Sequence, residues 1–560
     1  MARPWIRGLA AALALSAAGG VLVASNPPPV CADGAREWRE DLRFMAAEME
    51  RHHRNLFHAV PRERFGAAVR ELDARIPSLA RHQIIVEMAR IVAMVGDGHT
   101  NLAPTRDPKV GFRTYPIRLY LFADGLAVRA ASREHAGAVG AKVVRIGRVS
   151  ADEAYAAVRE LIGRDNEMGA RFFAPHLLVM PEVLHALGLV EDMDDAAFTL
   201  DAGGEVRTVH LAPAGPAELL APETDTTWMP RPGLLDARDG AARPTPLWLQ
   251  APEDRYRFVP LPGERAVYVQ YNQVADKEGG ETIAQFADRL LAFVDGHPVD
   301  RLVLDLRLNR GGHGELNRPL VRALIRARRI DRPGGLFVLI GRGTWSAAQF
   351  LVDDLERYTD AIFVGEPTGG KVNSFGDSKK ITLPHSGLTV RVSTLWWQGD
   401  ERDRRPWTAP QVAADLTLAG YRANVDPALE AALHYLPKES LADSLREAAD
   451  AGDFALAARR YDEWRRDSVH RWADDAETQV NRLGYDLLAA KRADAAVGIL
   501  RLNAEAFPQS PNAWDSLGEA QAAAGDRESA IRSYETALRL DPGSSSAADA
   551  LRKLRAAEAN

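Results

Sequence analysis

A serine in the second half of the chain follows an apolar strand pattern, in a position suited to nucleophilic chemistry. The run FVLI at 337–340 leads into GRGTWSAAQF, where Ser346 precedes a helical pattern. A hydroxyl at such a strand-to-helix turn stands above the sheet, and the free N–H groups of a helix N-terminus favour a developing oxyanion. Acyl transfer is the chemistry that this arrangement allows. The alternative is that Ser346 only caps the helix, as serine often does, and the chain lacks the G-x-S-x-G elbow of the α/β-hydrolases.

Three further segments contain residues that could assist such a serine. His99 lies in VGDGHT, where glycines flank a potential base on a turn, although a lone histidine is often structural and Asp97 with His99 makes a weak metal site. Gly311 and Gly312 follow the buried strand pattern LVLDLRL and allow either close approach to a carbonyl or a tight turn. No G-K-[ST] follows them, which disfavours a phosphate loop. Lys371 ends VGEPTGGK, and a lysine can act as a general base when it is desolvated, although most lysines are solvated.

Together and in this order, these segments resemble the tail-specific protease family, also called the C-terminal processing serine peptidases. The resemblance spans about residues 40–436 and implies a crotonase-like α/β core with a catalytic serine. It also implies a small peptide-binding module similar to a degenerate PDZ domain. The matching motifs are GDGHT at 96–100, DLRLNRGG at 305–312, TWSAAQF at 344–350, GEPTGGKVNSFGD at 365–377 and the closing proline-containing segment WTAPQVAADL at 407–416.

The resemblance implies Ser346 as the nucleophile and leaves two residues open as its base. In bacterial processing proteases the base is a lysine some 25 positions later, which is the spacing of Lys371 here. In the tricorn-like branch it is a histidine from an element that resembles GDGHT, and the glycine-flanked turn favours His99; Lys371 would then bind or orient substrate. A later carboxylate orients the histidine in that branch, and Asp403 is the nearest candidate. The implied oxyanion-hole donors are the backbone N–H groups of Gly311 or Gly312 and of Ala347. No metal or organic cofactor is implied.

Helix and strand periodicities predict a multidomain α/β protein with a parallel-sheet core. From residue 264 to 436, continuous apolar strands alternate with amphipathic helices, which predicts a largely parallel sheet covered on both faces and the catalytic core. Before it we expect an N-terminal helical domain at 34–113, a PDZ-like α+β module at 114–213 and a linker or ordered excursion at 214–263. In the helical domain, Leu42, Met45 and Met49 mark one buried face of a helix.

The C-terminal residues 440–560 are alanine-rich, helical in pattern and repetitive. Gly484 recurs as Gly518 and Ala496 as Ala530, each after 34 residues, which is the tetratricopeptide period. This predicts an all-α tetratricopeptide domain with a concave surface for a protein partner. The alternative is an ordinary helical bundle.

The composition of the chain excludes several classes of protein, and its N-terminal residues predict where it is located. The 560 residues contain 70 Lys and Arg against 77 Asp and Glu, so no basic field attracts nucleic acid. A single cysteine excludes a disulfide framework and a thiolate zinc site. Residues 1–32 combine a positive start, an uncharged run at 8–24 and a small-residue exit. They predict a signal peptide, and hence an exported protein that is periplasmic or secreted, with an N-terminal anchor as the alternative.

The sequence as a whole predicts an exported serine endopeptidase that cleaves peptide bonds through an acyl-enzyme on Ser346. A peptide or protein is the expected substrate, and a protein partner is expected on the tetratricopeptide surface. Two alternatives stay open: a catalytically inactive peptide- or lipophile-binding protein on the same fold, and a tetratricopeptide scaffold whose protease-like core is merely structural.

Overall fold

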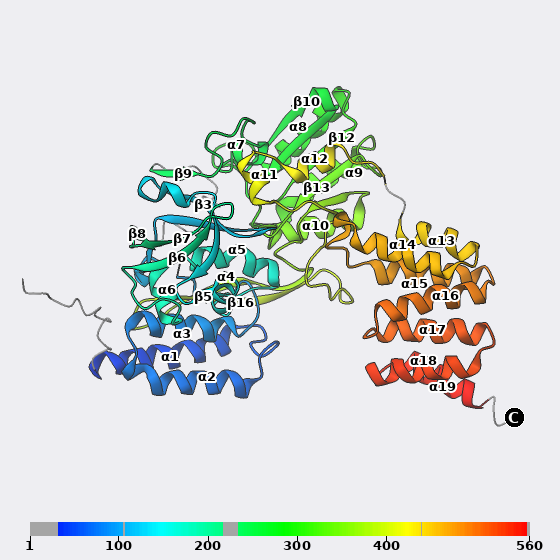
Figure 1. Ribbon diagram of the computed structural model, residues 1–560, viewed down its shortest axis with the longest axis horizontal. Coiled ribbons are helices and arrows are strands. Elements are labelled where there is room, and N and C mark those ends of the chain that lie inside the picture. The colour runs from blue at the N-terminus through cyan, green and yellow to red at the C-terminus, as the bar shows by residue number, and fades with distance from the viewer. Residues whose placement is uncertain (1–31, 105–106, 217–232, 438–439, 557–560) are drawn as a thin grey trace, which may run out of the picture.

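The computed structural model describes residues 32–104, 107–216, 233–437 and 440–556 (Figure 1). The segment expected to be a signal peptide or anchor lies outside these ranges except for its last residue, and so does part of the expected linker. In the described ranges, no helix combines the length and the apolar character needed to cross a membrane. The expectation of a chain anchored by an apolar helix is therefore corrected, because the described ranges give it no support, and export stays a prediction.

Helices form the N-terminal part of the described chain, as predicted. Leu42, Met45 and Met49 are fully buried on one face of the first helix, which confirms the inference from their spacing. The helix that precedes the GDGHT motif ends before Gly96, whose φ of 83° turns the chain away. The three helices are α1 (Ala32–His52), α2 (Arg62–Arg75) and α3 (Arg81–Ala93).

An antiparallel sheet of strand order β2-β3-β4-β6-β7 follows, with β5 pairing β4 and β9 pairing β3. Its last hairpin turns at Gly203 and Gly204, both with positive φ, as the sequence predicts. Helices α4 (Ala151–Arg159), α5 (Glu167–Leu177) and α6 (Pro181–Ala186) lie between β5 and β6 in the chain. The strands are β2 (Ile117–Phe122), β3 (Gly125–Ser132), β4 (Lys142–Ile146), β5 (Val149–Ser150), β6 (Ala196–Asp201), β7 (Val206–Leu211) and β9 (Leu234–Asp236).

The central sheet has the order β10-β11-β12-β13-β14-β17 and is parallel except for the edge strand β10. One face packs on α8 (Ile283–Gly296), α9 (Arg318–Arg326) and α10 (Ala347–Tyr358), and the other packs on α12 (Pro427–Leu433). This confirms a mostly parallel sheet covered on both faces. The strands are β10 (Tyr256–Leu261), β11 (Ala266–Tyr271), β12 (Arg301–Asp305), β13 (Leu336–Ile340), β14 (Ile362–Gly365) and β17 (Val412–Ala413).

The Pro/Gly-rich segment 214–263 is ordered wherever it is described, and its strands join three sheets. It contains β8 (Gly215–Pro216), which pairs β1 (Arg113–Thr114), as well as β9, α7 (Leu247–Gln250) and β10. Pro260 lies in β10, which has a neighbour on one side only, so the missing N–H of proline is tolerated there. The central sheet therefore begins before the expected boundary at residue 264.

A long hairpin leaves the central sheet and reaches the N-terminal helices. Its strands are β15 (Asn373–Thr382) and β16 (Thr389–Gln398). Asp41 of α1 accepts hydrogen bonds from the backbone of His385 and Ser386 at 2.9 and 2.8 Å. Val390 and Val392 of β16 share one buried core with Leu42 of α1. The hairpin thus fastens the central sheet to the helices that carry the GDGHT motif.

The C-terminal helices stack in pairs at one side of the molecule (Figure 1). Ala493 and Arg527 begin α16 and α18, 34 residues apart, and the packing repeats at the same interval. A Cβ on Gly484 would meet Leu500, and one on Gly518 would meet Tyr534. The helices are α13 (Leu441–Asp450), α14 (Phe454–Arg466), α15 (Ala476–Ala489), α16 (Ala493–Ala506), α17 (Pro511–Ala523), α18 (Arg527–Leu540) and α19 (Ser545–Ala556); α11 (Leu418–Arg422) precedes α12.

Candidate active site

Ser346 lies between β13 and α10 in a backbone conformation that a capping serine does not need. Its φ is 56° and its ψ is −126°, a region that favours glycine. Within the described chain its side chain makes no cap hydrogen bond to the helix. The backbone of Trp345 donates to Asn309 O at 3.2 Å, and Ser346 O accepts from Gln349 at 2.8 Å, so both sides of the residue are held. The geometry does not support the interpretation of Ser346 as a simple N-cap.

The side chain of Ser346 meets His99, which comes from a loop 247 positions earlier. His99 Nε2 lies 3.1 Å from Ser346 Oγ. The imidazole also stacks on the ring of Trp345, with centroids 4.0 Å apart and an interplanar angle of 23°. The residue before the serine therefore fixes the plane of the ring that faces the serine.

Asp97 holds the loop of His99 in place. Its carboxylate accepts the backbone N–H groups of His99 and Thr100 at 3.0 and 2.8 Å, and the hydroxyl of Ser393 in β16 at 2.7 Å. His53 Nε2 lies 2.9 Å from the same carboxylate. Burial alone would raise the pKa of Asp97, but the bonds from His53 and Ser393 outweigh it and keep the pKa low.

The same carboxylate and two histidines come close enough to raise the question of a metal ion. Ligand atoms of His53, His58 and Asp97 lie within 4.8 Å of one another. However, the N–H of Asn55 donates to His53 Nδ1 at 3.0 Å, which places the proton of that ring on Nε2. This proton points to Asp97, so His53 offers no free lone pair to a cation. The hydrogen bonds fit structural support of the GDGHT loop better than metal binding.

Sequence analysis did not single out Asp165, whose carboxylate links the loop of Ser346 to the loop of His99. Asp165 Oδ2 accepts from Trp345 Nε1 at 2.7 Å, and Oδ1 accepts from the backbone of Gly98 at 3.1 Å. Trp345 precedes Ser346 and Gly98 precedes His99, so one side chain positions the loops of both residues. A Cβ on Gly98 would lie 2.8 Å from the Trp345 ring and 3.0 Å from Asp165 Oδ2, so glycine is needed for this approach.

Burial and nearby carboxylates act on His99 in opposite directions. Burial lowers the pKa of the imidazole below its ordinary 6.5, while Asp165, Asp97 and Asp377 oppose that shift, Asp165 most strongly. Burial also raises the pKa of Asp165 itself, opposed by His99 and by the Trp345 hydrogen bond. His99 is therefore neutral at pH 7, the state in which it can accept a proton. Nδ1 of the ring is buried and has no well-formed hydrogen bond among the described residues.

Two backbone N–H groups beside Ser346 have no hydrogen-bond acceptor within the described ranges: those of Gly312 and Ala347. The N–H of Gly311 instead donates to Asn309 Oδ1 at 2.9 Å. Gly311 still needs to be glycine, because its φ is 95° and a Cβ would lie 2.8 Å from Ser346 Cβ. The O of Gly311 and the N–H of His313 both bond to Val274, which fixes the loop.

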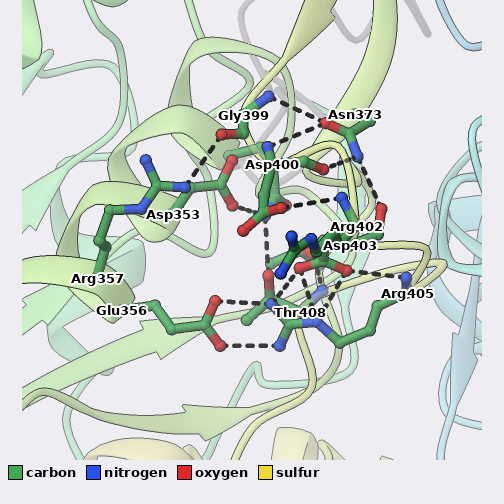
Figure 2. A network of polar contacts seen from close by, with 12 residues as sticks. Asp353, Glu356, Arg357, Asn373, Gly399, Asp400, Arg402, Asp403, Arg405 and Thr408 are labelled. Carbon is green, nitrogen blue, oxygen red and sulfur yellow. Dashed lines mark hydrogen bonds and ion pairs between the residues drawn. The ribbon is translucent and has the colours of Figure 1, made fainter.

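Lys371 and Asp403 do not take part in the hydrogen bond between His99 and Ser346. Among the described residues, no hydrogen bond joins the amino group of Lys371 to Ser346, although its charge lowers the pKa of Asp165. Asp403 forms an ion pair with Arg405 at 2.6 Å, and Arg405 also pairs with Glu356 of α10 at 2.7 Å (Figure 2). The Asp403 carboxylate is thus committed to a network around Arg405, and it is absent from the groups that shift the pKa of His99.

Apolar features border the Ser346–His99 pair. A Cβ on Gly376 would lie 3.0 Å from Trp397 and 3.8 Å from His99, so both rings approach this glycine of β15. Trp397 packs on Phe350, one turn after Ser346, and is 42% exposed. A small open cleft lined mainly by apolar side chains adjoins Gly98, the neighbour of His99.

Comparisons with known proteins return distant structural likenesses. No protein-family model matches the chain, and no curated protein matches it. The chain resembles mature CPAF at 12% identity with a TM-score of 0.46, covering 71% of this chain and 96% of that one. It resembles the photosystem II D1 C-terminal processing protease at 16% identity with a TM-score of 0.34, covering 73% and 98%. It also resembles the first TPR domain of the human RPAP3 protein at 20% identity with a TM-score of 0.16, covering 21% and 90%. Likenesses at this level decide nothing about activity.

Proposed function

We propose that the chain is a serine endopeptidase in which Ser346 is the nucleophile and His99 is the general base. The observation that carries the proposal is the 3.1 Å contact between Ser346 Oγ and His99 Nε2, made by a strained serine beside two free N–H groups. A structural serine has no need of this combination. In this proposal Lys371 is not the base, but its charge lies near Asp165 and helps to bind or orient substrate.

The reaction follows from these positions. His99 with its proton on Nδ1 takes the Ser346 hydroxyl proton on Nε2 while Oγ bonds to the substrate carbonyl carbon. The carbonyl oxygen becomes an oxyanion, which the N–H groups of Gly312 and Ala347 stabilise. The tetrahedral centre then collapses, the C–N bond breaks, and His99 returns the proton to the leaving amine. Water, deprotonated by His99, adds to the acyl-enzyme and releases the second product and the free serine.

We assign the supporting carboxylate to Asp165 rather than to Asp403. Asp165 bonds to the residues that precede Ser346 and His99, and its charge favours the imidazolium that forms during the reaction. Asp403 is held by Arg405.

We further propose that the chain belongs to the tail-specific protease family, tricorn-like branch, on the strength of its ordered motifs. The central sheet, whose first strand begins at Tyr256, would belong to the crotonase-like core expected at 264–436, and residues 114–213 would be the PDZ-like module beside the helices at 34–113. The helix pairs at 440–560 would be tetratricopeptide repeats that bind a protein partner, with the repeated glycine packing as support.

Labelling with a fluorophosphonate probe tests the proposal directly. The purified chain should be labelled on Ser346 and should cleave an unstructured protein, while Ser346→Ala and His99→Ala should do neither. A folded wild-type protein that takes no label would instead favour a binding protein on the same fold. A matched control is Ser374→Ala, which removes another serine hydroxyl, buried in β15, and should leave labelling intact.

A further inference from the structure

We propose that Asn166, the residue between Asp165 and α5, is a positioning residue for the proposed catalytic site. Its side-chain amide holds two loops, which in turn hold the segments before and after Ser346. This inference rests on the proposed peptidase function and adds a residue that acts on the site without touching the substrate or the reacting atoms.

The amide of Asn166 forms hydrogen bonds at both ends, and the residue is only 8% exposed. Its Oδ1 accepts the backbone N–H groups of Met168 and Gly169 at 2.9 and 3.2 Å, which caps α5. The reverse orientation would turn Oδ1 toward other oxygens and Nδ2 toward N–H groups, so the contacts fix which end is which. The Nδ2 group donates to three backbone carbonyls at 3.1, 3.0 and 2.8 Å, those of Thr368, Gly370 and Pro406.

Capping alone does not call for an asparagine at this position. Asp and Ser cap helices about as well as Asn does. However, an ionised Asp has no hydrogen to donate, and Ser has a single hydroxyl hydrogen. The three donated bonds therefore depend on the N–H₂ group of Asn166, and they join α5 to the loops that follow β14 and precede β17 of the central sheet.

The loop at 368–370 holds the segment that leads into Ser346. The backbone N–H groups of Gly369 and Gly370 both donate to Thr344 O, at 3.0 and 3.2 Å. A Cβ on Gly369 would lie 2.3 Å from a backbone oxygen of the same segment, so the two stretches of backbone are in close contact. A shift of this loop would therefore move the residues before the proposed nucleophile.

The segment that contains Pro406 holds the residues after Ser346. The Thr408 hydroxyl accepts from Gln349 Nε2 at 2.9 Å, and the backbone N–H of Gln349 donates to Ser346 O at 2.8 Å. The Gln349 side chain is almost fully buried in α10. Asn166 therefore reaches the serine from both directions along the chain.

Asn166 also holds its neighbour Asp165 in place. The Asp165 carboxylate accepts from Trp345 Nε1 and from the backbone of Gly98. Burial lowers the pKa of His99, and among the carboxylates that oppose this shift Asp165 acts most strongly. Without the Asn166 amide, the turn that carries Asp165 loses its attachment to two loops of the site, so the base should feel a weaker negative charge.

Asn166→Ser in the full chain is the test, because it keeps a capping oxygen and removes the N–H₂ group. We expect kcat on an unstructured peptide to fall by about 10–100-fold, since a misplacement of about 1 Å has an effect of this size. KM should change by less than about threefold, because Asn166 does not touch the substrate. The rising limb of kcat/KM against pH should move to lower pH, as it should in Asp165→Asn.

A double variant separates positioning from a general loss of stability. Once Asp165→Asn has removed the charge, adding Asn166→Ser leaves no charge to misplace, so the limb should stay where Asp165→Asn alone puts it. Ser150→Ala is the matched control, because it removes the N-cap of α4, the helix before α5, and should change neither kcat nor the limb.

Two results would overturn the role of Asn166 alone: a folded Asn166→Ser with unchanged kcat, and one whose limb does not move. If Asn166→Ser does not fold, Asn166→Thr and Asn166→Asp, which also keep a capping oxygen, decide by the same loss of kcat. A wild-type chain that takes no fluorophosphonate label on Ser346 overturns the peptidase function, and the role of Asn166 with it.

Discussion

At the scale of single residues, the conformation of Ser346 separates a reactive serine from a cap. A φ of 56° with a ψ of −126° strains any residue with a Cβ, and such strain costs about 1–3 kcal/mol. We expect Ser346→Ala and Ser346→Gly to be equally inactive, since both lack the hydroxyl. However, Ser346→Gly should be more stable than Ser346→Ala by about 1 kcal/mol. Urea unfolding of the two variants measures the difference, and equal midpoints would show that the backbone is not strained.

The pH dependence of kcat/KM should identify the general base. His99 must be neutral to accept a proton, and burial lowers its pKa below 6.5 despite the opposing carboxylates. We therefore expect kcat/KM to rise with pH through a midpoint below 6.5 and then to level off. His99→Ala should lose several orders of magnitude in kcat, while Lys371→Ala should mainly raise KM. A rising limb well above pH 7 that disappears in Lys371→Ala would reverse the assignment of the base.

Asp165 should act as a positioning residue whose charge also reaches the base. Asp165→Asn removes the negative charge that raises the pKa of His99 most, so the rising limb should move to lower pH. The plateau rate should fall as well, because the imidazolium formed in the reaction loses its partner.

Trp345→Phe is the matched control for Asp165→Asn. It keeps a ring under His99 but loses the Nε1–H bond to Asp165. It should lower the rate without moving the limb as far. If Asp165→Asn leaves the limb in place, the carboxylate has a structural role only.

At the scale of elements, patterns within short stretches of sequence predicted the helices, strands and turns. Hydrophobic periodicity predicted the buried face of α1 and the alternation of strands and helices in the central sheet. Turn residues predicted the hairpin at Gly203 and Gly204. The motifs also singled out Ser346 and His99, which the fold brings into contact. Short-range signals therefore sufficed for the elements, whereas the pair was singled out by the order of the motifs along the chain.

The role of Asp165 and the shared N-terminal core could not be predicted from the sequence, because both depend on packing between distant segments. Asp165 lies in an ordinary polar turn, and its role appears only when Gly98 and Trp345 approach it in space. The expected boundary at residue 113 separates segments that share one hydrophobic core, which also takes in residues of β16. No periodicity within a segment records such a contact.

The loop after β12, which contains Gly311, gives a prediction at the scale of elements. Gly311→Ala would place a Cβ 2.7 Å from Ala347 N and 2.8 Å from Ser346 Cβ, at a φ of 95°. We expect a loss of about 1–3 kcal/mol in the free energy of unfolding and a large loss of kcat, because the loop must move away from the nucleophile. Gly314→Ala is the control: its φ is not positive, and its Cβ would meet the edge of the Phe350 ring at 3.0 Å and Ala347 Cβ at 3.8 Å, but no backbone atom. Equal damage from both variants would mean that the loop is generally intolerant.

At the scale of the whole molecule, three of the hydrophobic cores hold different parts of the chain together. One core unites the N-terminal helices with the antiparallel sheet, a second lies under α8, α9 and α10, and a third runs through the C-terminal helices. The Ser346–His99 pair lies between the parts held by the first two cores, since His99 follows α3 and Ser346 precedes α10. Relative movement of these two parts would change the 3.1 Å contact directly.

The C-terminal helices touch the rest of the chain through a small polar and aromatic contact. Trp472 Nε1 donates to the Asp415 carboxylate at 3.1 and 3.2 Å, and Arg471 pairs with it at 3.3 Å. The ring of Trp472 also meets Trp407 edge-on at 6.3 Å. Burial at this contact raises the pKa of Asp415, against the Trp472 and Arg471 interactions.

We therefore expect deletion of residues 440–560 to leave a folded and active core. The repeats pack mainly on one another, so their removal exposes the Asp415 and Trp407 contact and little of the second core. The truncated chain should melt cooperatively and cleave a short unstructured peptide with kcat/KM within about threefold of the full chain, whereas cleavage of a protein held by the repeats should fall further. Trp472→Ala in the full chain isolates the contact and should shift the melting temperature by a few degrees at most. An insoluble truncation, or one that melts without cooperativity, would show that the repeats complete the catalytic fold.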